Sequence, residues 1–193
     1  KGFNIKFIYR SKKNNIPNLA LGLDDFAGTG LFTKEYIVAT NEFNNTKYTV
    51  GMGWGKFVGK NSFENPLSQL STSLLIRPDI SDNFKSGGSP SYDQLFRGDA
   101  TIFGGIEHSL SFARGLSLKL EYDPLDYLNF SANNRGDAIY ALRKKDSDIN
   151  VGLSYALNKH MTIDASYTKG NTFNLSFNLA ITFDNSLSTK PKF

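Results

Sequence analysis

The feature that most constrains the fold of this chain is an alternation of apolar and polar side chains with a period of two residues. Residues 172–183 show it most regularly, with apolar side chains at the odd positions and mainly Asn, Ser and Thr at the even positions. Successive side chains of a β-strand point to opposite faces of a sheet. The segment is therefore predicted to be a strand with one apolar and one polar face.

Eight further segments repeat this alternation, five of them clearly and three weakly. The clear ones are residues 3–10, 47–54, 116–123, 148–157 and 161–167, and the weak ones are residues 19–24, 31–40 and 100–108. No segment shows a convincing apolar pattern at helical spacing. The sequence therefore predicts an all-β chain of nine strands that forms a single domain over residues 1–193.

The connections between these segments differ in length in a regular way. Residues 56–99 and 124–147 form two long connections, and both follow even-numbered strands. Short connections follow the first, third, fifth and seventh strands. In an up-and-down arrangement both long connections therefore lie at the same end of the sheet. Outer-membrane barrels have short periplasmic turns and long external loops, so we expect residues 56–99 and 124–147 to be external loops.

Charged side chains are confined to one face of the clearly alternating strands. They are Lys6, Arg10, Lys47, Lys119, Glu121, Asp123 and Asp164. A soluble lipocalin-like barrel or a sandwich shows the same alternation with its apolar face turned inward, so the period alone leaves both readings open.

Three features favour a membrane barrel over the soluble alternatives, the third being the regularly alternating segment 173–183, whose aromatic end resembles the terminal-strand signal of bacterial barrel assembly. The polar face is rich in Gly, Ser, Asn and Thr, which suits a wet or densely hydrogen-bonded lumen. The second feature is a set of aromatic residues near strand ends on the apolar face, as in the girdles of outer-membrane barrels. They are Tyr9, Trp54, Tyr122, Tyr155, Tyr167, Phe173 and Phe183.

Composition excludes several other classes of protein. The chain has no cysteine, so it can form neither a disulfide nor a thiolate metal site. Its net charge of +4 is spread along the sequence rather than gathered in a basic stripe, which argues against nucleic acid as a partner. No run of 18 apolar residues occurs, so no transmembrane helix is predicted. We expect no metal and no cofactor.

An odd strand number is awkward for a single-chain bacterial barrel, which closes with an even number. An open edge in lipid would leave backbone N–H and C=O groups unpaired at several kcal/mol each. The chain also begins at Lys1 without a Met or a signal peptide. We therefore predict an antiparallel up-and-down transmembrane β-barrel of about 10–12 strands, in which N-terminal strands before Lys1, or another chain, complete the ring.

Seven sequence motifs resemble a known family when they are read in order. They are residues 18–40, Gly51-Met-Gly-Trp-Gly55, Phe96-Arg-Gly98, Ile102-Phe-Gly-Gly-Ile-Glu107, Leu118-Lys-Leu-Glu-Tyr122, Asn150-Val-Gly-Leu-Ser-Tyr155 and Lys169-Gly-Asn-Thr172. Together they resemble the YjbH-type (WbfB-like) family of exopolysaccharide-related outer-membrane proteins, over residues 1–183. The resemblance implies further strands upstream and a role in secretion or assembly of extracellular polysaccharide. Asp24 and His108 depart from it, because the family commonly has a basic and an aromatic residue there.

Two glycine-containing motifs are predicted to have structural roles. Residues 51–55 lie within a predicted strand with no helix after it, so they are not a phosphate-binding loop. Their glycines are predicted to leave room on the inner face for a plug, a loop or a glycan chain. Asp25, Gly28 and Gly30 predict a tight turn, with contact to a partner as the alternative.

The candidate functional residues are charged side chains that alternate onto the polar face. They are Lys6, Arg10, Glu35, Lys47, Glu107, Lys119, Glu121 and Asp164. One reading is an ion-pair network that fills or lines the barrel. The other is a sugar-contacting or gating channel, because carboxylates accept hydrogen bonds from hydroxyl groups and aromatic rings stack on pyranose faces.

Nothing in the sequence favours a catalytic or metal site. His108 and His160 are the only histidines, and Ser109 points to the face opposite its neighbour His108. Residues 146–150 open like a calcium loop but lack the Gly and the closing Glu that such a loop needs, so they are predicted to form a turn.

These patterns predict an outer-membrane β-barrel that is not an enzyme, and the family resemblance implies that it belongs to a Gram-negative bacterium and takes part in exopolysaccharide or capsule export or assembly. A passive porin, or a structural barrel subunit of an outer-membrane complex, is the main alternative. An enzyme that modifies lipid or glycan is the third. The expected partners are outer-membrane lipid, polysaccharide, and other envelope proteins or missing strands of the same polypeptide.

Overall fold

The computed structural model describes residues 2–13, 16–27, 32–59, 61–78, 92–127 and 144–180. These residues form nine β-strands and three short 3₁₀ helices. The strands are β1 (Ile5–Tyr9), β2 (Asn18–Asp24), β3 (Lys34–Phe43), β4 (Thr46–Gly55), β5 (Ala100–Ser109), β6 (Leu116–Tyr122), β7 (Ile149–Asn158), β8 (Met161–Thr168) and β9 (Thr172–Leu179). The 3₁₀ helices are η1 (Pro66–Gln69), η2 (Thr72–Leu74) and η4 (Tyr92–Gln94).

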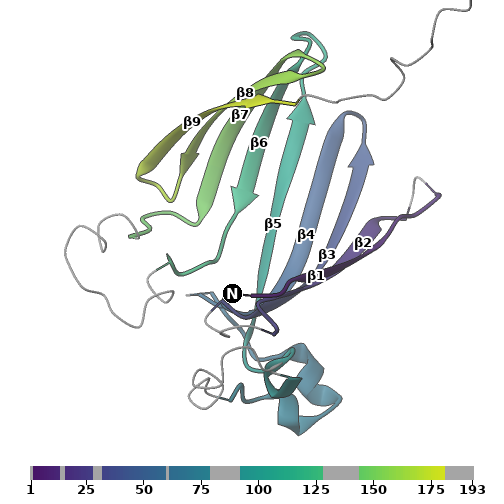
Figure 1. Cartoon of the computed structure of the whole chain (residues 1–193), viewed down its shortest axis with the longest axis vertical. Coiled ribbons are helices and arrows are strands. Elements are labelled where there is room, and N and C mark those ends of the chain that lie inside the picture. The colour runs from purple at the N-terminus through teal and green to yellow at the C-terminus, as the bar shows by residue number, and fades with distance from the viewer. Residues whose placement is uncertain are drawn as a thin grey trace, which may run out of the picture.

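All nine strands belong to one antiparallel sheet in which each strand pairs with the next along the chain. Figure 1 shows that this sheet curves, with β1 and β9 at its two outer edges. The prediction of an all-β, up-and-down, nine-strand arrangement is confirmed. The sheet is not closed, because no pairing among the described strands joins β1 to β9.

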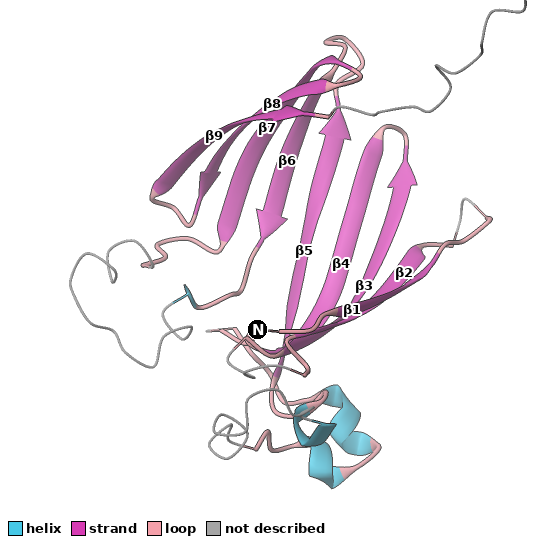
Figure 2. Ribbon diagram, viewed as in Figure 1, coloured by secondary structure: helices cyan, strands magenta, loops and turns pink. Residues whose placement is uncertain are grey.

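The β3–β4, β5–β6 and β7–β8 turns lie at one end of the sheet, and the long β4–β5 connection and the short β8–β9 turn lie at the other, as Figure 2 shows. The β3–β4 hairpin turns through Asn44 and Asn45, whose φ angles of 47° and 62° are those of a type I′ turn. The connection between β4 and β5 contains η1, η2 and η4 at the other end. These helices were not predicted, because one-turn helices carry no apolar periodicity. No helix in the described ranges is long and apolar enough to cross a bilayer.

The strand register collects the apolar residues on one face of the sheet. Phe7, Leu21, Ile37, Met52 and Ile102 lie opposite one another in a continuous row across β1 to β5. A second row crosses the other half of the sheet and consists of Leu120, Val151, Tyr167 and Phe173. Directly opposed residues share a face, so both rows belong to the apolar face.

This apolar face is uncovered over most of its area. Phe7, Leu153 and Leu175 are 62%, 41% and 70% exposed, and Trp54 and Ala100 are the only buried hydrophobic residues in the described part of the chain. A soluble sandwich or lipocalin-like barrel would pack these side chains into a core. The described strands instead leave them on the surface.

Some sequence predictions fall on residues outside the described ranges. They concern Lys1, the turn glycines Gly28 and Gly30, and the end of the last predicted strand at residues 181–183.

Candidate functional site

Charged residues of alternating sign cross the polar face of the sheet. Lys47 in β4 lies opposite Glu107 in β5, and Glu107 lies opposite Lys119 in β6. Two residues further along β5 and β6, Gly105 lies opposite Glu121. Lys47, Glu107, Lys119 and Glu121 together line one hollow of about 350 Å³. The structure therefore brings four of the eight candidate residues to one place.

The other candidates on this face do not line this hollow. Lys6 is opposite Gly22 near the β1 edge, and Arg10 directly follows β1. Asp164 in β8 forms an ion pair with Lys119, with 3.6 Å between carboxylate oxygen and Nζ. Asp164 also accepts a hydrogen bond of 2.7 Å from the amide of Asn178.

Three aromatic rings on the polar face pack over glycines of neighbouring strands. A Cβ atom on Gly22, Gly51 or Gly53 would come within 2.2 to 2.7 Å of the ring of Tyr36, Phe103 or Phe57, respectively. Phe57 stacks on Phe103, and Tyr36 meets both rings edge-on. The glycines thus accommodate the chain's own rings, where the sequence predicted room for a plug, loop or glycan.

Sequence reasoning missed this aromatic cluster, which consists of Tyr36, Phe57 and Phe103. It assigned aromatic residues to the apolar face, and Tyr36 and Phe57 lie in or near weakly alternating segments. The available signal was the run of glycines at alternate positions of β4, because glycine inside a strand marks a close approach of other groups.

A second hollow of about 380 Å³ adjoins the first, and the two share Phe103 and Glu121. Its wall includes Asp123, Tyr127, Asn150 and Lys169. The Tyr127 hydroxyl donates a hydrogen bond of 2.6 Å to the Asp123 carboxylate. Burial raises the pKa of the Tyr127 phenol, and the hydrogen bond to Asp123 and the Asp123 charge raise it further.

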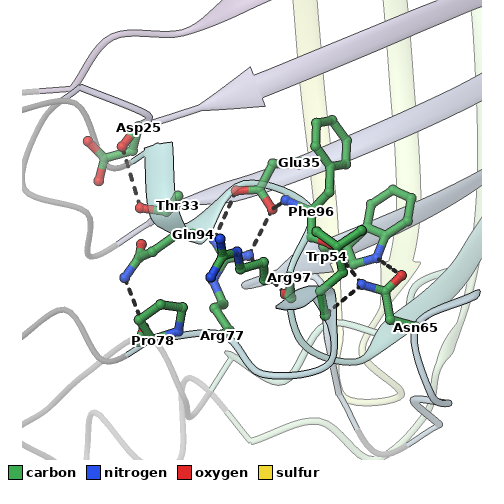
Figure 3. Close-up of polar contacts among 11 residues, drawn as sticks. Asp25, Thr33, Glu35, Trp54, Asn65, Arg77, Pro78, Gln94, Phe96 and Arg97 are labelled. Carbon is green, nitrogen blue, oxygen red and sulfur yellow. Dashed lines mark hydrogen bonds and ion pairs between the residues drawn. The ribbon is translucent and has the colours of Figure 1, made fainter. Parts of the chain in front are cut away.

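Glu35 is not on the polar face, so its sequence assignment was wrong. The register places it opposite Leu23 and Trp54, on the apolar face. Both of its carboxylate oxygens accept hydrogen bonds from Arg77, at 2.8 and 2.9 Å, and one also accepts from the Phe96 N–H at 3.2 Å. Glu35 is fully buried, and Figure 3 shows these contacts. The Glu35 carboxylate is bonded to residues of the β4–β5 connection, and the alternation pattern of a strand cannot predict such a contact.

Trp54 was predicted to belong to an exposed aromatic girdle, and this is also wrong, because it is 1% exposed. Its indole N–H donates to Asn65 Oδ1 at 3.0 Å, and its ring meets Phe96 edge-on at 5.2 Å. The Asn65 amide donates to the carbonyls of Leu74 and Phe96 (Figure 3). Glu35, Trp54, Asn65 and Arg77 form a loop clamp, which fixes residues 61–78 and 92–99 against the apolar face at the ends of β3 to β5.

Asp25 lies directly after β2 with a φ of 52°, where the tight turn was predicted. Its carboxylate accepts the Phe32 N–H at 3.1 Å, and its own N–H donates to Asn4 at 2.9 Å. Asp25 therefore joins the start of β1 to the β2–β3 connection.

His108 and Ser109 have separate partners. His108 Nδ1 lies 2.7 Å from the hydroxyl of Thr46, whereas the hydroxyl of Ser109 lies 3.1 Å from that of Ser117. Within the residues that the structure describes, no group of three His, Cys, Asp or Glu side chains could hold a metal ion.

Comparison with known proteins gives the family of the chain. The sequence profile of the YjbH family, described as "Exopolysaccharide biosynthesis protein YbjH", matches residues 1–192. The chain belongs to the YjbH family. This confirms the resemblance found in the sequence motifs.

One relative within the YjbH family is the "Uncharacterized lipoprotein YjbH" of Escherichia coli (strain K12). It is 32% identical over 184 residues, which are 95% of this chain and 25% of that protein. The chain therefore spans about a quarter of the length of this relative. No solved structure matches the chain.

Proposed function

We propose that this chain is a section of an outer-membrane β-barrel that takes part in exopolysaccharide export or assembly and is not itself an enzyme. One observation supports the barrel more than any other: the apolar face of the nine-strand sheet is exposed along its whole width. Ile5 in β1, Ile102 in β5 and Phe177 in β9 are 38%, 47% and 57% exposed.

The physical reason is the cost of such a face in water. Soluble proteins rarely expose contiguous apolar patches larger than a few hundred Å². Each Å² of apolar surface removed from water contributes about 25 cal/mol, so acyl chains stabilise this face strongly. The opposite face then lines the lumen, where its Ser, Asn, Thr and charged side chains contact water or a hydrophilic chain.

The two edges of the sheet set a condition on this proposal. Among the strands that the structure describes, β1 and β9 each pair on one side only. Unpaired backbone groups in lipid cost several kcal/mol each, so the barrel needs further strands beside these edges. The proposal therefore requires strands from the same longer polypeptide or from a second chain to complete the ring.

The polysaccharide role is supported by the family description and by the chemistry of the polar face. The description of the family names exopolysaccharide biosynthesis. The E. coli relative is named a lipoprotein, which supports a location in the cell envelope. A face with Lys, Glu, Asn and Ser side chains offers many donors and acceptors for sugar hydroxyl groups.

The experiment that tests this role is deletion of the gene in a strain that makes surface polysaccharide. We expect surface polysaccharide to be lost while uptake of small hydrophilic solutes is unchanged. The deletion strain is complemented with the normal gene to show that the effect belongs to this protein. Unchanged polysaccharide with reduced solute uptake would contradict the proposal and favour a passive porin.

A further inference from the structure

We propose that the first hollow on the polar face is a binding subsite for a neutral hexose unit of a polysaccharide, with the ring of Phe103 as its stacking platform. This inference rests on the proposed function, which places the polar face in contact with a glycan. It goes further by naming the residues that bind the sugar and the charge class of that sugar.

The hollow exists because β5 lacks side chains at its centre. Gly105 lies between Thr49 of β4 and Glu121 of β6. Without a side chain there, the polar face has a depression bounded by Phe103 on one side and by the row of Lys47, Glu107 and Lys119 on the other. Its volume of about 350 Å³ lies within the range of ordinary small-molecule sites.

The Phe103 ring is held in place by its neighbours. Phe57 stacks on it with 4.9 Å between centroids and 8° between planes, and Tyr36 meets it edge-on at 6.4 Å. The ring also lies over Gly51, where a Cβ atom would come within 2.3 Å of it. Since Phe57 covers one face of the ring, the other face is available to the C–H face of a pyranose. A ring fixed in this way loses little entropy on binding.

The charges around the hollow favour a neutral sugar. Two ammonium groups, from Lys47 and Lys119, balance two carboxylates, from Glu107 and Glu121. A polyanionic glycan would meet a carboxylate beside every ammonium group, so it gains little from this arrangement.

Lys119 pairs with Asp164 and Glu121 accepts a hydrogen bond of 3.2 Å from the Asn150 amide, so the hydrogen-bonding capacity left for a ligand lies mainly at Glu107 and Lys47. Among the described residues, no ion pair within 4.0 Å joins Glu107 to Lys47 or to Lys119, although each pair is directly opposed. Sugar hydroxyl groups can donate to the carboxylates and accept from the ammonium groups, and hydrogen bonds to charged groups are the stronger kind.

The position of the second hollow indicates the direction in which a bound sugar chain would extend from the first. It shares Phe103 and Glu121 with the first and extends to Asp123 and Tyr127. An oligosaccharide that places one hexose on Phe103 can therefore place the next against the Tyr127 side. This arrangement suits a polysaccharide that moves along the sheet, because a sugar chain can pass between neighbouring sites of similar affinity without binding tightly to either.

The test is binding of two neutral hexamers, maltohexaose and cellohexaose, to the complete barrel that contains this chain, inserted in lipid nanodiscs and read by saturation-transfer NMR. We expect at least one hexamer to receive saturation at its pyranose C–H protons. Phe103→Leu retains apolar volume but removes the ring, and should weaken binding about tenfold. Phe103→Tyr should restore it. Glu121→Gln should weaken binding about fivefold.

The matched control is Asn174→Ala in β9, which lies on the same polar face but lines neither hollow. It should leave binding unchanged. No saturation transfer to either hexamer in a correctly folded and inserted protein would overturn this inference and leave the proposed function standing. Tighter binding of hexagalacturonate than of both neutral hexamers would overturn the assignment to a neutral sugar. Failure of that complete barrel to insert into lipid would instead overturn the proposed function.

Discussion

The two halves of the sheet differ in what covers their apolar face. In β7 to β9 the alternation is regular, most of the apolar residues are exposed, and the connections are short turns of a few residues between neighbouring strands. In β3 to β5 the same alternation continues, but the loop clamp buries Glu35 and Trp54 at the strand ends. The alternation of a strand therefore determines on which face of the sheet a residue lies. The connections between strands determine whether that residue is exposed or covered by protein.

The difference matters for stability because the two regions hold their charges differently. Glu35 is fully buried and bonded to Arg77 through both oxygens. Asp164 pairs with Lys119 across a more open surface, with side-chain exposures of 28% and 43%. Removing one partner of a buried pair is costly, whereas exposed pairs contribute little.

The largest effect is expected for Glu35→Ala. The change removes the carboxylate that accepts from the Arg77 guanidinium and from the Phe96 N–H, so it should lower the free energy of unfolding by about 3 kcal/mol. Urea unfolding in detergent micelles measures it. The matched control, Asp164→Asn, should cost less than about 1 kcal/mol. Equal losses for the two variants would contradict the larger contribution of the buried Glu35–Arg77 pair to stability.

The next effect concerns the apolar face of the regular half. Leu153 in β7 is 41% exposed, and Leu153→Arg should cost about 2–4 kcal/mol if lipid contacts this residue near the bilayer centre. The neighbouring change Ser154→Arg places the same charge on the polar face, beside Asp164, and should cost much less. Folded fractions in lipid vesicles measure both. Equal tolerance of the two arginines would contradict the assignment of the faces.

A smaller effect is expected for Trp54→Phe. The change removes the indole donor to Asn65 and leaves a buried carbonyl oxygen with one partner fewer, while the ring contact with Phe96 is largely kept. A lost hydrogen bond of this kind costs about 1 kcal/mol. Urea unfolding measures it, and an unchanged midpoint would show that the bond does not stabilise the loop clamp.

The sequence predicted the strands better than the site, for physical reasons that particular residues illustrate. Phe173, Leu175 and Phe177 reveal their face because period-two alternation is a local property of the backbone. Glu35 and Trp54 could not be placed because their partners Arg77 and Asn65 lie in a long connection without periodicity.

The candidate site was predictable in part. Lys47, Glu107 and Lys119 were assigned to the polar face from alternation, and the register confirms that they are opposed. Their convergence on one hollow depends on Gly105 and on the packing of Phe103 against Phe57, which no local pattern contains.

The smallest effect concerns pH. The raised pKa of the half-buried Tyr127 means that the folded state holds the phenol proton more tightly than the unfolded state does. The associated stability is complete below about pH 10 and is lost as the pH rises toward the folded-state pKa. Tyr127→Phe should remove this alkaline loss. Urea unfolding at a series of alkaline pH values checks it, and an identical pH profile for both proteins would contradict the contribution of Tyr127.

The central claim is that the apolar face contacts acyl chains. Trp54 is the single tryptophan, so Trp54→Phe provides a background without indole fluorescence. In that background, Leu153→Trp and Ser154→Trp place one indole on each face of β7, and lipids brominated on their acyl chains quench an indole that touches them. The account predicts strong quenching at position 153 and weak quenching at position 154. Weak quenching at 153 with strong quenching at 154, or no quenching at either, would contradict it.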